Sequence, residues 1–503
     1  MCFVPTVPPQ RLRSRWCRFT LIIPGLFALA AAALDARAEP ASPAQAAHAL
    51  PPALQTLLDE HELSPAAISL LVHKPGEDEP RLQFQAGQPR NPASVMKLFT
   101  TYAALDALGP AHTWTTRVHA DGPVEAGRLE GDLWIEGSGD PLLTAERFWE
   151  LLGSVQRRGV DAITGDLVLD RSRFAPTESG AGAFDGRPYR AYNQPPHPLL
   201  VNYNAIQFEL ESVDAEGRVR VAFHPPLDGL EVDNRLQLDD DAWCNAYRWH
   251  VGFALDTERD PPTAILDGRH GSGCDLARLY RSALPVEDYV HDLFDSLWRQ
   301  WGGEFDGGWR SGEWSGPEDE PLVEHESGPL SEAVRRINKY SNNVMTRQLA
   351  LSLAAERADG PVTEADGRSA VRAILDEHGL DTAGMVLDEV AGLSRTNRVS
   401  AVQVADLLEL AAASRFAPEF QASLPIAGID GTLSSRFADS AATGRMRMKT
   451  GMLRDASTIA GYLRNHDDED LIAVILINGN EVRGGRGHAV QEAILHWILE
   501  GGA

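Results

Sequence analysis

The placement of lysine is the feature that most constrains this chain of 503 residues. The chain contains four lysines against 42 arginines, and three of the four lie in or beside short motifs. A lysine can lose its proton when it is buried or close to another cation, whereas an arginine effectively cannot. An arginine-favouring composition alone would also make lysine rare, so the motifs themselves carry the argument. They are Ser94-Val95-Met96-Lys97, Ser341-Asn342-Asn343 (two residues after Lys339) and Lys449-Thr450-Gly451.

The first motif is expected at the start of a helix. Apolar residues recur at three- and four-residue steps from Ser94 to Leu108, and Gly109 ends the pattern. Lys97 then lies one turn after Ser94 on the same face, within reach of the serine oxygen. A free serine hydroxyl is a poor nucleophile at neutral pH and needs a base. A lysine whose pKa is depressed by burial, or by a nearby cation such as Lys449, can be that base.

The other two motifs are weak alone and informative together. Ser341-Asn342-Asn343 has poor helix propensity and interrupts a helical pattern over residues 330–355, so we expect it in a short connection between two helices. Lys449-Thr450-Gly451 is expected at the end of a strand over 445–449, where an edge strand can hold an extended peptide. An ordinary capped helix and an ordinary glycine turn are the alternatives. All three motifs in this order favour a catalytic interpretation.

The rest of the pattern predicts an α+β fold with a long insertion. Three alternating segments near the C-terminus predict antiparallel strands with a terminal helix packed on them, at residues 445–449, 457–463, 471–477 and 488–499. A buried strand over 66–73 and a partner over 82–85 precede the first motif. Residues 111–320 show short alternating runs and proline-rich connections, so this part is expected to be mostly β. Helices are predicted over 145–159, 286–301, 364–378 and 400–414.

Residues 1–38 are predicted to be a secretory signal peptide. Several arginines precede an apolar run of 16 residues, Phe19 to Leu34, and Ala36-Arg37-Ala38 offers a cleavage site. An uncleaved anchor is the alternative, but the run is short for a membrane span and Pro24 interrupts it. No later stretch is long and apolar enough to span, so no transmembrane segment is expected after cleavage, and the protein is expected in the periplasm. Export favours a single disulfide between Cys244 and Cys274, with two unpaired thiols as the alternative.

Charge and histidine spacing argue against several function classes. The formal net charge of −26 argues against nucleic acid and anionic membrane surfaces as partners. The 15 histidines show no metal-binding spacing, and no glycine-rich loop precedes a helix in the form that binds phosphate, so no metal or cofactor is expected. Gly137-Ser138-Gly139 is interpreted as a turn, and Trp298 and Trp301 as core or interface residues. The oligomeric state is not predicted.

The three motifs resemble those of the penicillin-interacting serine enzymes, and most closely the D-alanyl-D-alanine carboxypeptidase/endopeptidases of the penicillin-binding protein 4 type, the S13 serine peptidases. The 243 residues between Lys97 and Ser341 are similar to the insertion known in that family. Further similar stretches lie at 136–141, 201–204, 392–395 and 428–433. The resemblance implies a penicillin-binding/β-lactamase-like core formed by residues 39–110 and 321–503, with residues 111–320 inserted.

The resemblance also implies roles for the motif residues. The implied nucleophile, its base and the residue that relays a proton to the leaving amine are Ser94, Lys97 and Ser341. The implied substrate-binding residues, which hold the acyl-side amide and the terminal carboxylate and line the oxyanion hole, are Asn343, Lys449, Thr450, Gly451 and Met452. The oxyanion donors would be the main-chain N–H groups of Ser94 and Met452.

Two departures from the family pattern stand out. Met452 occupies a position where family members usually have Thr or Ser, which removes one hydroxyl near the substrate carboxylate. The family's Gly-Ser-Gly-Leu-Ser stretch reads Val390-Ala391-Gly392-Leu393-Ser394, which is expected to change a loop near the site and not the chemistry.

The sequence therefore predicts a serine DD-peptidase of peptidoglycan. Its substrates would be stem peptides ending in D-Ala-D-Ala and D-Ala-linked cross-bridges, and β-lactams would acylate the same serine. A β-lactamase is one alternative, although the insertion is then unexplained. A non-catalytic protein that binds the cell wall is the other.

Overall fold

The computed structural model describes residues 49–503, apart from 178, 214–217, 243, 245–249, 275 and 317–319. The predicted signal peptide, residues 1–38, lies outside these described residues and stays a prediction. Over the described ranges, no helix combines the length and the apolar character that a bilayer span needs.

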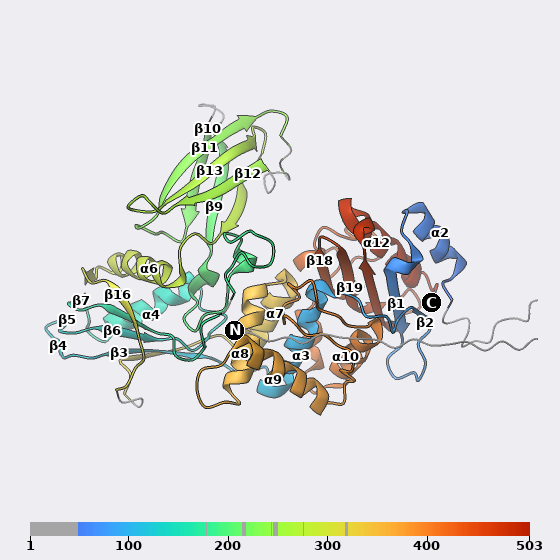
Figure 1. Ribbon diagram of the computed structural model, residues 1–503, viewed down its shortest axis with the longest axis horizontal. Coiled ribbons are helices and arrows are strands. Elements are labelled where there is room, and N and C mark those ends of the chain that lie inside the picture. The colour runs from blue at the N-terminus through green and yellow to red at the C-terminus, as the bar shows by residue number, and fades with distance from the viewer. Residues whose placement is uncertain are drawn as a thin grey trace, which may run out of the picture. The chain divides into compact units, whose positions relative to one another are not determined.

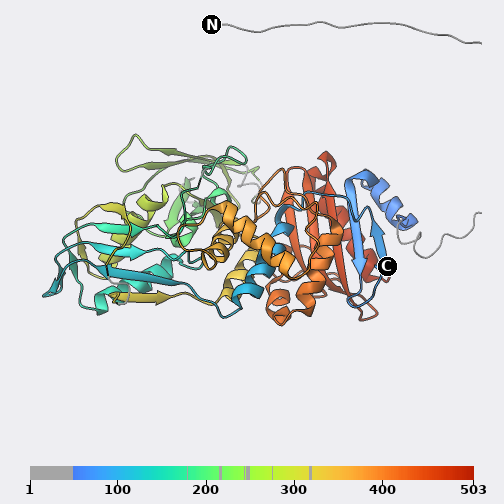
Figure 2. The same ribbon diagram turned by 60° about the horizontal axis from the view of Figure 1, so that its bottom comes forward.

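One five-stranded sheet is built from both ends of the described chain. Its strand order is β18-β19-β20-β1-β2, and all neighbours are antiparallel. The strands are β1 (Ile68–His73), β2 (Leu82–Phe84), β18 (Met446–Leu453), β19 (Ala456–Arg464) and β20 (Asp470–Asn478). Figure 2 shows the early strands, in blue, beside the late strands, in red. The three predicted C-terminal strands are confirmed, and the pairing of β1 with β20 joins the predicted N-terminal pair to them.

Both faces of this sheet are covered by helices. Side chains alternate along β20, so Val474 and Leu476 pack in one apolar cluster while Ile475 and Ile477 pack in another. The first cluster contains residues of α3 (Lys97–Leu108) and α10 (Ala401–Ala413), and the second contains residues of α2 (Pro52–Glu60) and α12 (Arg486–Leu499) (Figure 1). Each fully buried aliphatic side chain contributes about 1.5–3 kcal/mol relative to exposure. β18 and its neighbours are thereby held rigidly from both sides.

The helices beside the sheet follow the predicted pattern. The interruption at Ser341 separates α7 (Leu330–Tyr340) from α8 (Asn343–Ala355), as expected. Thr363 and Ser400 form capping boxes at the starts of the two helices that follow, which explains why both begin where the sequence predicts. These are α9 (Glu364–Glu377) and α10, and α11 (Ala417–Ser423) comes after them.

Two local predictions about the motifs are wrong. Lys449-Thr450-Gly451 lies inside β18, not at its end, because the strand continues to pair with β19 as far as Leu453. Glycine is disfavoured in strands, so sequence patterns end a strand there, whereas cross-strand pairing carries it on. Ser94 lies in a 3₁₀ turn, Ala93–Met96, and the α-helix proper begins at Lys97.

The residues between the first two motifs are mostly β, as predicted. A five-stranded sheet contains β3 (Thr115–Ala120), β6 (Leu133–Glu136), β8 (Leu167–Asp170), β16 (Trp309–Gly312) and β17 (Val323–Glu326). A four-stranded sheet contains β4 (Val124–Glu125), β5 (Arg128–Leu129), β7 (Ala162–Ile163) and β15 (Glu304–Phe305). The two predicted helices, α4 (Ala145–Arg157) and α6 (Val286–Gln300), share one apolar core with these sheets.

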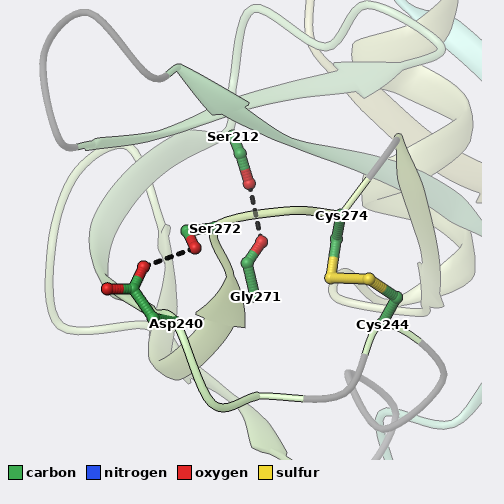
Figure 3. The surroundings of a disulfide bond; sticks show 6 residues. All are labelled: Ser212, Asp240, Cys244, Gly271, Ser272 and Cys274. Carbon is green, nitrogen blue, oxygen red and sulfur yellow. Dashed lines mark hydrogen bonds between the residues drawn. A yellow bond between two sulfur atoms is a disulfide. The ribbon is translucent and has the colours of Figure 1, made fainter.

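Two further three-stranded sheets complete this part. One contains β9 (Ile206–Val213), β10 (Arg218–His224) and β14 (Ala277–Arg281), and the other β11 (Glu231–Asp239), β12 (Val251–Asp256) and β13 (Thr263–Gly271). A disulfide joins Cys244 and Cys274 just beyond β11 and β13, which confirms the predicted pairing (Figure 3). Gly271 must be glycine there, since a Cβ would lie 2.3 Å from the Cys274 sulfur.

Candidate active site

Ser94 and Lys97 lie together at the start of α3. Lys97 Nζ is 3.0 Å from Ser94 Oγ, and the lysine side chain is fully buried. The same nitrogen is 2.7 Å from Asn343 Oδ1 and 2.5 Å from the main-chain oxygen of Ala391. A neutral amine has two N–H groups and one lone pair. When Lys97 is protonated, it donates to all three groups; when it is neutral, Asn343 and Ala391 can take both N–H groups, and the lone pair is then available to the Ser94 hydroxyl.

Burial is the main reason why the Lys97 amine can be neutral. It lowers the pKa of Lys97 from its usual 10.5 to about 7, against the opposing attraction of Glu389 and with added repulsion from Arg347. A substantial fraction of the side chain is therefore the free base near neutral pH. Arg347 is a repelling cation that the sequence did not suggest. Lys449, which it did suggest, also repels Lys97, because the same mutual repulsion helps to lower the pKa of Lys449.

Arg347 and Glu389 also hold the loop that faces Lys97. Arg347 Nε donates to Glu389 Oε1 at 3.0 Å, and Glu389 Oε2 accepts from the main-chain N–H of Leu393 at 2.6 Å. Gly392 lies in this loop at φ 84°, and a Cβ there would lie 1.9 Å from the main-chain oxygen of Ala93. Sequence reasoning missed this pair. The stretch over residues 390–394 was expected to lie close to the site. The types of residue in a stretch do not show where a main-chain carbonyl, such as that of Ala391, points.

The second motif presents Ser341 to Lys449. Ser341 ends α7 in the left-handed conformation at φ 58°, and the Asn342 side chain then caps α8 by accepting from the Met345 N–H at 3.0 Å. This sharp reversal directs Ser341 Oγ to Lys449 Nζ, 2.9 Å away. A left-handed residue other than glycine is strained and is often found where function requires the geometry.

Lys449 is the second fully buried lysine of the site. Its Nζ donates to Ser341 Oγ and to the main-chain oxygen of Thr450, at 2.9 and 2.7 Å. Burial, and then repulsion from Lys97, hold the pKa of Lys449 well below its usual value. Repulsion between two amines disfavours the state in which both are protonated.

Gly451 allows β18 to approach the serine turn. A Cβ at this position would lie 2.8 Å from the main-chain nitrogen of Ser94 and 2.3 Å from Thr458 Oγ1. Thr458 Oγ1 in turn donates to the Pro92 carbonyl at 2.7 Å, which ties β19 to the same turn. Only glycine fits this approach. Met452, the next residue, is 58% exposed.

A pair of asparagines fixes the turn that carries Ser94. The Asn478 side chain accepts from the Asn91 N–H at 2.6 Å and donates to the Asn91 carbonyl at 3.0 Å. The Asn91 side chain accepts from the Ala93 N–H and donates to the Ser394 carbonyl. Three separate segments therefore meet at the turn, and no pattern in the sequence predicted this network.

The remaining candidates lie apart from this centre. Lys339 is buried and pairs with Asp430. Trp298 is fully buried in the core of the intervening residues, as predicted, and Trp301 stacks on Trp149 with ring centres 4.3 Å apart. Across the described ranges, no group of three or more His, Cys, Asp or Glu side chains is arranged to hold a metal ion.

Comparison with known proteins identifies the family. The model of the D-Ala-D-Ala carboxypeptidase 3 (S13) family matches residues 50–499. The chain belongs to this family. A D-alanyl-D-alanine carboxypeptidase of Actinomadura sp. is 30% identical over 465 residues, which cover 89% of this chain and 84% of that protein. The sequence resemblance is thereby confirmed.

Solved structures show the same fold. Penicillin-binding protein 4 from Haemophilus influenzae superposes with a TM-score of 0.73 at 22% identity, covering 89% of this chain and 99% of that one. The same protein in complex with a β-lactam gives a TM-score of 0.70 at 24% identity, with the same coverage. The predicted α+β penicillin-binding fold is confirmed.

Proposed function

We propose that this family member is a serine DD-peptidase that works through an acyl-serine intermediate on Ser94. The observation that carries the proposal is the buried Lys97 amine, 3.0 Å from Ser94 Oγ, with acceptors for both of its N–H groups. A lysine held in this way is a base, not a surface cation.

In the proposed acylation, Lys97 takes the proton of Ser94 as its oxygen attacks the carbonyl carbon of the penultimate D-Ala. The negative charge on the carbonyl oxygen is held by the main-chain N–H groups of Ser94 and Met452, which the approach of Gly451 to the serine turn brings close. Lys449 and Thr450 bind the terminal carboxylate, and the Asn343 amide holds the acyl side.

The leaving amine then needs a proton. Ser341 Oγ, bonded to Lys449 Nζ, is the proposed relay that passes on the proton taken up by Lys97 as the C–N bond breaks, which leaves Lys97 as the free base again. Water next attacks the ester carbonyl while Lys97 takes its proton, and Lys97 returns that proton to Ser94 Oγ as the ester bond breaks and the shortened peptide is released. A D-Ala-linked cross-bridge presents the same carbonyl, so one route serves both carboxypeptidase and endopeptidase activity.

We propose further that residues 1–38 direct export to the periplasm and are removed. Residues 39–110 and 321–503 would form the catalytic core, with residues 111–320 as an inserted part. Peptidoglycan stem peptides and cross-bridges would be the substrates and β-lactams the inhibitors. The β-lactam complex of the Haemophilus influenzae protein supports the last point by similarity.

The test is covalent labelling with a fluorescent penicillin. Wild-type protein should carry the label through electrophoresis, and Ser94→Ala should not. Ser341→Ala, one motif away, should still be labelled, although more slowly, because it keeps the nucleophile and the base and loses only the proton relay to the β-lactam nitrogen. Labelling of the Ser94→Ala protein would overturn the assignment, and rapid turnover of the penicillin would favour a β-lactamase. Products from purified cross-linked muropeptides would then separate carboxypeptidase from endopeptidase activity.

A further inference from the structure

Thr450 has a hydroxyl partner on another segment. Thr450 Oγ1 donates to Thr432 Oγ1 at 2.8 Å. Thr432 is exposed and lies in a 3₁₀ turn, Gly431–Leu433, that the proposed mechanism does not use. The two hydroxyls are therefore adjacent on the accessible side of the third motif, at the residue proposed to bind the substrate carboxylate.

A partly buried ion pair fixes the turn that carries Thr432. Lys339 is 2% exposed, and its Nζ lies 2.8 and 2.7 Å from the two carboxylate oxygens of Asp430. Asp430 Oδ1 also accepts from the Ile426 N–H at 2.8 Å. Gly431 follows at φ 60°, and a Cβ there would lie 2.6 Å from the Lys339 carbonyl. The turn is thus held directly against the end of α7, two residues before Ser341.

The same segment is also attached to β18. The Ala427 N–H donates to the Met446 carbonyl at 3.0 Å, and the Met448 N–H donates to the Pro425 carbonyl at 2.9 Å. These bonds reach Met448, and the chain then turns to place Thr432 beside Thr450. Thr432 therefore has a fixed distance to the third motif, set by a backbone pairing and by an ion pair.

We propose that Thr432 is a positioning residue of the carboxylate site, acting through Thr450. A hydroxyl has one proton and two lone pairs. When Thr450 turns its proton to a bound carboxylate, its bond to Thr432 survives only if Thr432 becomes the donor. Thr432 then orients the Thr450 hydroxyl and strengthens it as a donor. This inference rests on the proposed function.

In this proposal, the Thr432 hydroxyl compensates for the hydroxyl that is missing at Met452. Family members usually have Thr or Ser there, and this chain has a thioether side chain without a donor. A hydroxyl on the neighbouring turn supports the remaining threonine in its place. The recognised chemistry is a carboxylate on the leaving-group side, in a peptide or a β-lactam.

The test compares a D-Ala-D-Ala peptide with its C-terminal carboxamide. Thr432→Val should lower kcat/KM for the carboxylate form about five- to tenfold, the size expected for the loss of one hydrogen bond between neutral groups, and leave the carboxamide form unchanged. Thr432→Ser should keep the wild-type ratio, because it restores the hydroxyl. Ser434→Ala removes another exposed hydroxyl from the same loop and is the matched control.

The same substitution in a Met452→Thr protein tests this compensation directly. There, Thr432→Val should lower kcat/KM for the carboxylate peptide at most twofold, since the new hydroxyl contacts the carboxylate itself. Equal losses for both peptide forms, or an unchanged Thr432→Val enzyme, would overturn the inference while penicillin labelling of Ser94 stays intact. Absence of labelling in the wild-type protein would instead overturn the proposed function, and this inference with it.

Discussion

The proposed catalytic centre and the two three-stranded sheets near the disulfide use charged side chains in opposite ways. At the centre, Lys97 and Lys449 are fully buried, and each has defined acceptors. On β11 and β13, by contrast, Arg235 and Arg269 form ion pairs at 54% and 69% exposure. Water and salt screen such exposed pairs, so they add little. We therefore expect the activity of the centre to change when only a few side-chain atoms are altered. The stability of the two sheets depends instead on backbone pairing and on the Cys244–Cys274 disulfide.

The largest effect is expected from Lys97→Arg. Arginine keeps the positive charge but stays protonated at neutral pH, so it cannot accept the Ser94 proton. The second-order rate of penicillin acylation should fall by about a thousandfold or more, in line with the loss of a general base. Thermal unfolding of the same sample is the control for folding. A folded Lys97→Arg enzyme with normal acylation would show that Lys97 is not the base.

Lys449→Arg should have a smaller effect. The side chain keeps its charge for the substrate carboxylate, but the guanidinium is larger than the ammonium group that it replaces at a fully buried position. We expect kcat/KM for a D-Ala-D-Ala peptide to fall about 10- to 100-fold, mainly through KM, since a charged contact is weakened and not abolished. Steady-state kinetics measure the split. A change confined to kcat would assign Lys449 to proton transfer.

The pH profile should follow Lys97. Its pKa is lowered to about 7, and only the free base can accept the serine proton. Acylation should therefore be lost as pH falls through about 7, roughly tenfold per pH unit, and should level off above it. Stopped-flow measurement of acylation between pH 5 and 9 tests this. A flat profile over that range would contradict a lysine base with a depressed pKa.

The smallest effect on activity is expected at the disulfide. Replacing Cys244 and Cys274 by serine opens a link between residues 30 apart in sequence. Chain-entropy reasoning gives a loss of about 3–4 kcal/mol in the free energy of unfolding of these sheets. Calorimetry should show a lower transition, while penicillin labelling per folded molecule stays at the wild-type level. Lost labelling in the folded double variant would show that these sheets and the catalytic centre are coupled.

Local signals in the sequence predicted much of the secondary structure. Ser400 was expected to start a helix and does so with a capping box, and the interruption at Ser341 separates two helices as predicted. These features depend on residues a few positions apart. The path of β18 through Gly451 was not predicted, because it depends on pairing with β19 and on packing against the serine turn.

The supporting residues of the centre were missed for the same reason. Arg347 and Glu389 are ordinary charged residues in the sequence, and Thr432 lies in a stretch recognised only as similar to the family. Each gains its importance from a contact with a segment far away in the chain, such as the loop that faces Lys97 or the hydroxyl of Thr450.

The sequence by itself determined which groups are available: a serine, two scarce lysines and a Ser-x-Asn triplet, in an order that fixes the family. Tertiary structure decided their chemical state. The pKa of Lys97 falls because its amine is buried, in a site that Asn343 and Ala391 help to form from 246 and 294 positions away. Desolvation is a property of surroundings that the whole fold builds, and no pattern of neighbouring residues contains it.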